Sequence, residues 1–134
     1  MTEKTNELHS ADSLVLAEEA VKTLLEKKAL EVKLFDVKET SAITDYYVNV
    51  TGRSLTHVAS LADELAYAFE MKGKEASRIE GKRGNSWILV DFGSLIVNVF
   101  DKEARSFYNF DRLLPTESSV SIDHLIEAVD EKFS

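Results

Sequence analysis

The sequence predicts a single α/β domain in which a mixed β-sheet is covered by helices, mainly on one of its faces. The 134 residues are enough for one hydrophobic core and too few for two comfortable ones. The segment 85–101 contains two β-rich runs joined by Gly93-Ser94, which is the signal of a type II′ hairpin. Elsewhere, amphipathic helical patterns are interspersed with strand patterns in the order helix, strand, strand, helix, strand, strand, strand, helix. This order is typical of an α/β domain.

The hairpin has two different faces. If Gly93 and Ser94 form the loop, Leu89 lies opposite Asn98, and alternate side chains point to opposite sides. One side is apolar throughout and is predicted to be core: Ile88, Val90, Phe92, Leu95, Val97 and Val99. The other side mixes aromatic and polar groups: Trp87, Leu89, Asp91, Ile96, Asn98 and Phe100. We expect this second face to be uncovered and to meet a partner.

The elements before the hairpin follow from their apolar spacing. A helix begins at Asp12 or Ser13 and ends near Lys28, and a first strand lies within 32–37. A second strand over 44–51 again alternates an apolar side with a polar, aromatic-bearing side. Ser54 is the expected cap of a long helix that ends at Gly73.

The remaining elements complete the domain plan. A short strand over 76–80 precedes the hairpin, and a helical turn over 102–107 is expected to return Phe107, Tyr108 and Phe110 to the sheet. Pro115 marks a boundary before an amphipathic terminal helix. We therefore predict a flexible N-terminal tail over 1–11, the main domain over 12–114 and a C-terminal helix over 115–134.

Composition narrows the classes of function. The chain carries 24 acidic and 16 basic side chains, a formal charge of −8, so direct DNA binding is not expected and a basic protein surface is the better partner. The absence of cysteine excludes disulfides and thiolate metal sites and agrees with a cytoplasmic location. The N-terminus is polar and no segment has the roughly 18 apolar residues of a membrane span. We expect a cytoplasmic protein with no membrane partner.

Local motifs do not predict an enzyme. The loop Gly81-Lys82-Arg83-Gly84 matches the Gly-x-x-Gly of RNA-binding KH modules, but a KH loop joins helices and this one joins strands. A nucleotidyl-transfer site needs at least two carboxylates on magnesium, and Asp91 is the only acid well placed on the hairpin. His57 is expected to hydrogen-bond near the Ser54 cap. We predict no catalytic residue, no metal and no cofactor.

Trp87 has two open interpretations from the pattern alone. A tryptophan is often part of a core, which is the simpler interpretation. Two members of its predicted face, Asp91 and Asn98, are polar, which favours a partner contact. The pattern supports both about equally.

An ordered series of motifs resembles the ribosomal silencing factor family, also called Iojap-like. It runs through Thr44-Asp45-Tyr46-Tyr47-Val48, Thr51-Gly52, Ser54, His57-Val58, Glu80-Gly81, Trp87-Ile88-Leu89-Val90-Asp91-Phe92-Gly93, Ile96-Val97, Val99-Phe100, Ala104-Arg105 and Phe107-Tyr108. The resemblance covers roughly 14–114. It implies a fold similar to nucleotidyltransferases without an active site, binding to ribosomal protein fourteen of the large subunit, and a block of subunit association that represses translation.

The resemblance also implies contact residues. Trp87 and Asp91 match the expected main contacts, and Tyr108 and position 98 match lesser ones. Asn98 stands where the family usually has histidine. Asparagine can still form a hydrogen bond at this position, but it cannot change its charge, which puts a charge-switching role in doubt. A patch around Trp87 and Phe100 also allows a homodimer when the ribosome is absent. The alternatives are an RNA-binding module in ribosome assembly and a nucleotidyltransferase-like enzyme.

Overall fold

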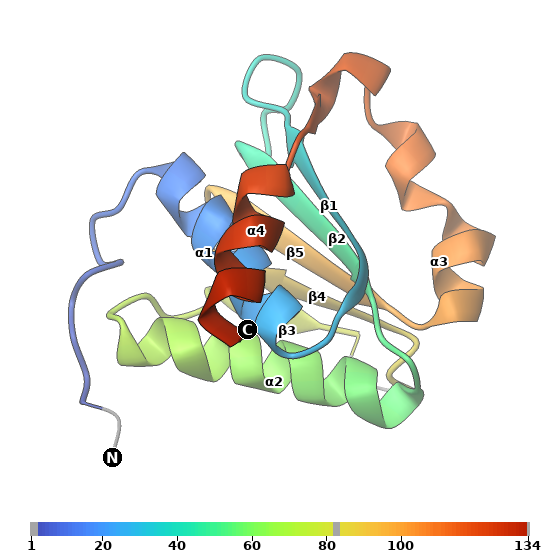
Figure 1. The fold of residues 1–134 in the computed structure, drawn as a ribbon. Helices are drawn as coiled ribbons and strands as arrows, with labels where there is room; N and C mark the ends of the chain where they lie inside the picture. Colours follow the sequence, from blue (N-terminus) through green and yellow to red (C-terminus); the bar gives the residue numbers. More distant parts are fainter. Residues whose placement is uncertain (1–2, 82–83, 134) are drawn as a thin grey trace.

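The computed structural model describes residues 3–81 and 84–133 and contains a six-stranded mixed sheet (Figure 1). The strand order is β3-β4-β5-β2-β1-β6. The pair β2 and β5 is parallel and the other neighbouring pairs are antiparallel. The strands are β1 (Leu30–Asp36), β2 (Tyr46–Thr51), β3 (Arg78–Glu80), β4 (Trp87–Asp91), β5 (Leu95–Phe100) and β6 (Ser119–Val120).

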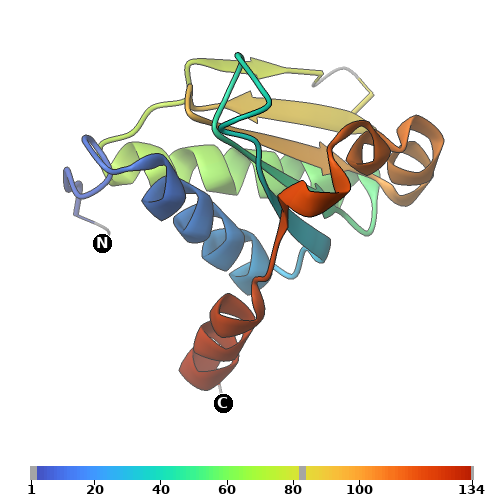
Figure 2. The ribbon, with the colours of Figure 1, turned by 90° about the horizontal axis from the view of Figure 1, so that it is seen from above.

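The helices lie on both sides of this sheet but unequally (Figures 1 and 2). The long helices α1 (Ser13–Glu26) and α2 (Leu55–Met71) cover one face. The short α3 (Lys102–Tyr108) and a 3-10 turn, η1 (Phe110–Leu113), lie over the other. A second 3-10 turn, η2 (Thr116–Ser118), leads to β6 and then to α4 (Asp123–Phe133), which packs on α1. The predicted fold class is confirmed.

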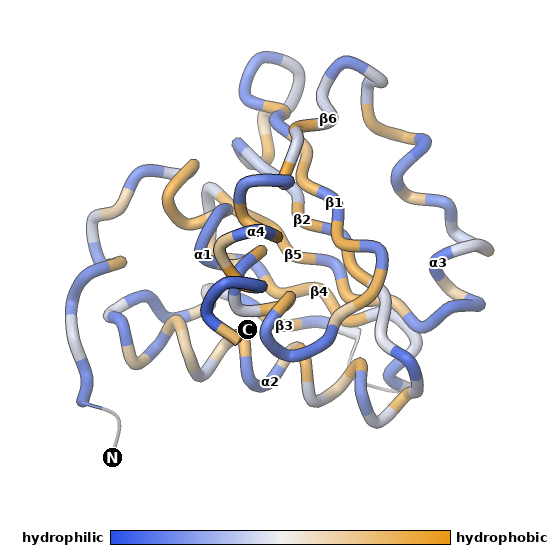
Figure 3. The backbone as a smooth tube through the Cα atoms, viewed as in Figure 1, coloured by the Kyte–Doolittle hydropathy of each residue, from blue (hydrophilic) through white to orange (hydrophobic). Residues whose placement is uncertain are grey.

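The hairpin forms in the predicted register. Leu89 pairs with Asn98 and Asp91 with Ile96, and Gly93 has the positive φ of 89° that a type II′ turn requires at its first loop residue. All six side chains of the predicted core face are buried, none more than 1% exposed. They pack under α1 and α2, whose apolar stripes complete the core. Figure 3 shows the resulting concentration of hydrophobic residues in the central strands.

Two of the predicted helix ends have clear local causes. Ser54 caps α2 by accepting a hydrogen bond from the backbone N–H of His57 at 3.0 Å. The His57 ring then accepts from the backbone N–H of Arg53 and faces the carbonyl of Lys27. The chain leaves α1 at Lys28, which takes a positive φ of 68°. The prediction that His57 serves the cap is therefore confirmed.

The opposite face of the sheet is less open than expected. The segment 102–114, which contains α3 and η1 and which we call the arm, crosses this face and packs Phe110 and Leu114 on Tyr47 and Ile96. Phe100 is 0% exposed, so the expected exposed patch around Trp87 and Phe100 is wrong in its second member. Phe100 is buried because the arm crosses this face and because the Trp87 ring packs on the Phe100 ring.

The N-terminal residues also differ from the expectation of a flexible tail. Residues 3–11 lie along the end of α2, where the backbone N–H of Thr5 donates to Met71 and that of Leu8 donates to Lys72. Leu8 is 2% exposed and joins the main core. Leu8 and the two backbone hydrogen bonds to the end of α2 therefore hold this segment on the domain. The expectation for residues 1 and 2 lies outside the described residues.

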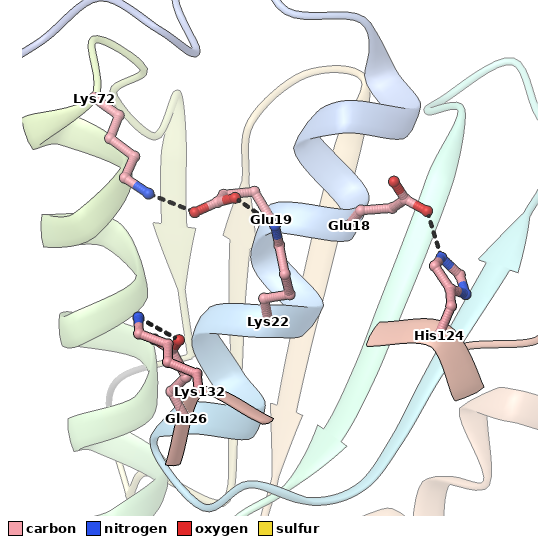
Figure 4. A network of polar contacts seen from close by, with 7 residues as sticks. All are labelled: Glu18, Glu19, Lys22, Glu26, Lys72, His124 and Lys132. Atoms are coloured by element: carbon pink, nitrogen blue, oxygen red, sulfur yellow. Dashed lines mark hydrogen bonds and ion pairs between the residues drawn. The ribbon is translucent and has the colours of Figure 1, made fainter. Parts of the chain in front are cut away.

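The C-terminal helix is joined to the rest of the domain by packing and ion pairs. Leu125 and Val129 are buried against the body of the protein. His124 Nε2 lies 2.9 Å from a carboxylate oxygen of Glu18 in α1, and Lys132 donates to Glu26 at 2.9 Å. Figure 4 shows both pairs. No helix in the described part of the chain is long and apolar enough to cross a membrane.

Candidate partner-binding site

The face beneath the arm is organised in three rows across the strands. Cross-strand pairing places Trp87 beside Phe100 and Thr51 in the first row. The second row contains Leu89, Asn98 and Asn49. The third contains Arg78, Asp91, Ile96 and Tyr47. The arm covers the part of each row that lies on β5 and β2, so the part on β4 stays accessible.

Trp87 is half-buried and lies at the border of the arm. Its ring centroid is 4.9 Å from that of Phe100 and 4.8 Å from that of Tyr108, while Phe110 meets it edge-on at 6.0 Å. Its indole N–H donates to Asn98 Oδ1 at 3.0 Å. Because that donor is used internally, Trp87 offers a partner its apolar ring and no hydrogen bond.

Asp91 is also partly accessible, with its side chain 18% exposed. Oδ1 accepts the backbone N–H of Gly93 at 2.7 Å, and Oδ2 lies 3.4 Å from the guanidinium of Arg78. Burial raises the pKa of Tyr47, and the negative charge of Asp91 raises it further. Arg78 therefore already supplies a positive partner for the Asp91 carboxylate.

Asn98 lies inside the protein rather than on its surface. It is 0% exposed, and its Nδ2 donates to Asn49 Oδ1 at 3.1 Å while its Oδ1 accepts from Trp87. Both ends of the amide are satisfied within the fold. Asn98 can therefore influence a partner through Trp87, and a direct contact is not available to it in this geometry.

Tyr108 is the most accessible of the expected contacts, at 48% exposed. It bridges Trp87 and Phe107, whose ring meets Tyr108 edge-on at 5.0 Å. Phe107 is 81% exposed, so the helical turn does not return it to the sheet as expected. We call Trp87, Leu89, Asp91, Phe107 and Tyr108 the docking face.

A hollow adjoins this face. It has a volume of about 660 Å³ and is lined by Ser86, by the start of α3 from Asp101 to Ala104, and by Phe107 and Tyr108. The hollow is open to solvent rather than enclosed. It offers room beside the aromatic rings for side chains of a protein surface.

Several residues of the site were not predicted from the sequence. Arg105 is buried and donates to Thr51 Oγ1 at 3.0 Å and to Asp111 Oδ2 at 2.9 Å. Asn49 donates from Nδ2 to Asp111 Oδ1 at 2.7 Å. The available signal was the pairing of two asparagines, Asn49 and Asn98, at polar positions of neighbouring strands.

The carboxylates near the site do not converge on an open position. Arg78 lies between Asp91 and Glu80, at 3.4 Å and 3.2 Å from their oxygens. Glu80 is a second acid on this face that the hairpin pattern did not include. Among residues 3–81 and 84–133, no group of three histidine or acidic side chains could hold a metal ion. Lys82 and Arg83, the central residues of the loop compared above with the KH motif, lie outside the described residues.

Fold and site together define an α/β domain with a partly exposed face of aromatic and acidic side chains. A family model described as "Ribosomal silencing factor during starvation" matches residues 10–134. The chain therefore belongs to the ribosomal silencing factor (RsfS) family, and the resemblance seen in its motifs is confirmed.

Individual relatives agree with this assignment. The ribosomal silencing factor RsfS of Halalkalibacterium halodurans is 33% identical over 107 residues, covering 80% of this chain and 92% of the relative. That of Haemophilus influenzae is 35% identical over 100 residues, covering 75% and 98%. A crystal structure of a Bacillus halodurans protein superposes with a TM-score of 0.70 at 32% identity, covering 82% of this chain and 99% of that one. A Chromobacterium violaceum crystal structure has the same fold, with a TM-score of 0.74 at 22% identity, covering 77% and 86%.

Proposed function

We propose that this protein represses translation by binding ribosomal protein fourteen of the large subunit and blocking association with the small subunit. The block is steric: a folded domain occupies space that the small subunit needs, and no bond is made or broken. Relatives at 33–35% identity are named ribosomal silencing factors, which supports the proposal. The protein then acts in the cytoplasm as a binding protein rather than as an enzyme.

The observation that carries the proposal is the docking face. A half-buried tryptophan flanked by an exposed tyrosine and phenylalanine is the composition typical of an interface hot spot. Asp91 adds a carboxylate beside these rings, and the formal charge of −8 favours approach to a basic protein surface. Trp87, Asp91 and Tyr108 are the proposed contacts, and Asn98 acts behind them.

The same face allows a homodimer when no ribosome is present. Phe107 is 81% exposed and its ring contacts that of Tyr108, which is 48% exposed; a contiguous exposed apolar patch can mark a protein interaction site. If a second copy of the protein and ribosomal protein fourteen bind the same face, added large subunits will convert the dimer into monomers bound to the ribosome. Light scattering of the free protein tests the dimer, and one that persists on the ribosome would count against a shared face.

Sedimentation of ribosomal subunits tests the function itself. The protein is incubated with isolated large subunits, small subunits are added, and the gradient is assayed for joined ribosomes. We expect the protein to sediment with large subunits and to reduce joining in proportion to its occupancy. Binding without any effect on joining would refute the steric block, and failure to bind would refute the proposed partner.

A matched pair of variants makes this test specific. Trp87→Ala removes the centre of the docking face, whereas Tyr67→Ala removes an aromatic side chain that is 57% exposed on α2, away from that face. We expect Trp87→Ala to lose the block and Tyr67→Ala to keep it. Equal behaviour of the two variants would mean that this face is not used.

A further inference from the structure

Behind the docking face runs a chain of hydrogen bonds that connects the arm with Trp87. Asp111 Oδ1 accepts from Asn49 Nδ2 at 2.7 Å, Asn49 Oδ1 accepts from Asn98 Nδ2 at 3.1 Å, and Asn98 Oδ1 accepts from the Trp87 indole at 3.0 Å. The two asparagines are both 0% exposed. We call these four residues the relay.

The chemistry of the two end residues, Asp111 and Trp87, fixes the direction of every hydrogen bond in the relay. A carboxylate can only accept hydrogen bonds and an indole N–H can only donate, whereas a primary amide does both from opposite ends. With Asp111 at one end, Asn49 must turn its NH₂ toward the arm and its oxygen toward Asn98. Asn98 must then turn its NH₂ toward Asn49, which leaves its oxygen for Trp87. A flipped amide at either buried position would place donor against donor and acceptor against acceptor.

Arg105 fixes the carboxylate end of the relay. Its guanidinium binds Asp111 Oδ2 at 2.9 Å and Thr51 Oγ1 at 3.0 Å, and its side chain is 9% exposed. The ion pair orients Asp111 with its other oxygen toward Asn49. The arm is thereby tied to β2 by the same group that sets the direction of the relay.

We infer that Asp111 is a positioning residue of the docking face: through Asn49 and Asn98 it holds the indole of Trp87 in the orientation that a partner meets. The inference concerns the free protein, and its meaning for docking rests on the proposed function. A preorganised aromatic side chain loses less conformational freedom on binding, which increases affinity. Asp111 thus contributes to recognition without touching the partner through its carboxylate.

The test uses the fact that Trp87 is the only tryptophan in the chain. A ¹H–¹⁵N NMR spectrum therefore contains one indole N–H signal, whose shift and solvent exchange report its hydrogen bond. Asp111→Ala removes the acceptor for the Asn49 amide. Arg112→Ala changes the neighbouring exposed residue and serves as the control.

We expect the indole N–H of Asp111→Ala to shift and to exchange with solvent at least about tenfold faster, while Arg112→Ala resembles the unmodified protein. Affinity for purified ribosomal protein fourteen is expected to fall about tenfold in Asp111→Ala, which corresponds to about 1.4 kcal/mol. An indole signal unchanged by Asp111→Ala would overturn the inference.

Asp111→Ala could also detach the whole arm from the sheet, so a second variant separates the two effects. Asn49→Leu interrupts the relay but leaves the bonds from Arg105 to Asp111 and Thr51 in place. Arm amides that keep their shifts while the indole signal changes support the inference, and an unchanged indole signal overturns it. Because the signal is read without a partner, a failure of the proposed function would appear separately, as equal binding by the unmodified protein and Trp87→Ala.

Discussion

Arg105 is the residue whose replacement should loosen the arm most. Its guanidinium makes one charge-assisted hydrogen bond to Asp111 and one buried bond to Thr51, and it lies 6.0 Å from the centre of the Phe100 ring. Arg105→Met keeps most of the aliphatic stem and removes all three interactions. The variant therefore separates the polar contribution of Arg105 from its packing.

The expected loss of stability in Arg105→Met follows from these contacts. Both bonds are donated by the charged guanidinium, and a hydrogen bond to a charged group contributes about 1.5–3 kcal/mol, part of which is offset by the cost of burying the guanidinium. The Asp111 side chain is 23% exposed, so water replaces part of the lost bond. We expect a loss of about 2–3 kcal/mol in the free energy of unfolding, or roughly 8–12 °C in Tm at about 4 °C per kcal/mol.

Urea denaturation followed by circular dichroism measures the loss, with Arg112→Met as the control. Arg112 is exposed on the same turn, so this control should change stability by less than about 0.5 kcal/mol. Hydrogen exchange should also show faster exchange of α3 amides and unchanged exchange in α2. A loss in Arg105→Met no larger than in the control would refute the reasoning that these bonds hold the arm.

Two other contacts give further predictions. In Glu19, burial raises the pKa, but the hydrogen bond and charge of Lys72, with the charge of Lys22, outweigh it and lower the pKa below its usual 4.5. The ionised form of Glu19 therefore stabilises the fold above about pH 4.5 by up to about 1 kcal/mol. This stabilisation is lost as the pH falls through the lowered pKa of Glu19. Stability curves of the unmodified protein and Glu19→Gln should converge at low pH, and a constant gap would contradict the ion pair. Leu8→Ala should cost about 2–3 kcal/mol in thermal unfolding because Leu8 is 2% exposed; a cost under about 0.5 kcal/mol would mean that residues 3–11 do not pack in solution.

Local patterns were sufficient to predict the hairpin and its two faces. Alternation along 87–100 fixes which side chains are buried together, and Gly93 supplies the positive φ that the turn requires. The cap at Ser54 is equally local, since its bond to His57 spans three residues. Such features depend on neighbours in the sequence, so the sequence alone predicts them.

The path of the arm could not be predicted in this way. Asn49 and Asp111 are 62 residues apart in the sequence, and Arg105 and Thr51 are 54 apart. Neither pair has a spacing that a helix or hairpin pattern encodes. Trp87 and Tyr108 are accessible as the sequence predicted, whereas Asn98 is buried, because the segment that covers Asn98 is remote in the sequence.

The most direct test of the account is the affinity of Trp87→Ala for purified ribosomal protein fourteen, measured by calorimetry beside Tyr67→Ala. Truncation of an interface tryptophan typically costs about 2 kcal/mol or more, or roughly thirtyfold in Kd. The account predicts a folded Trp87→Ala protein with at least that loss, and a Tyr67→Ala protein that binds like the unmodified one. A folded Trp87→Ala protein with unchanged affinity would contradict the claim that the docking face recognises the ribosome.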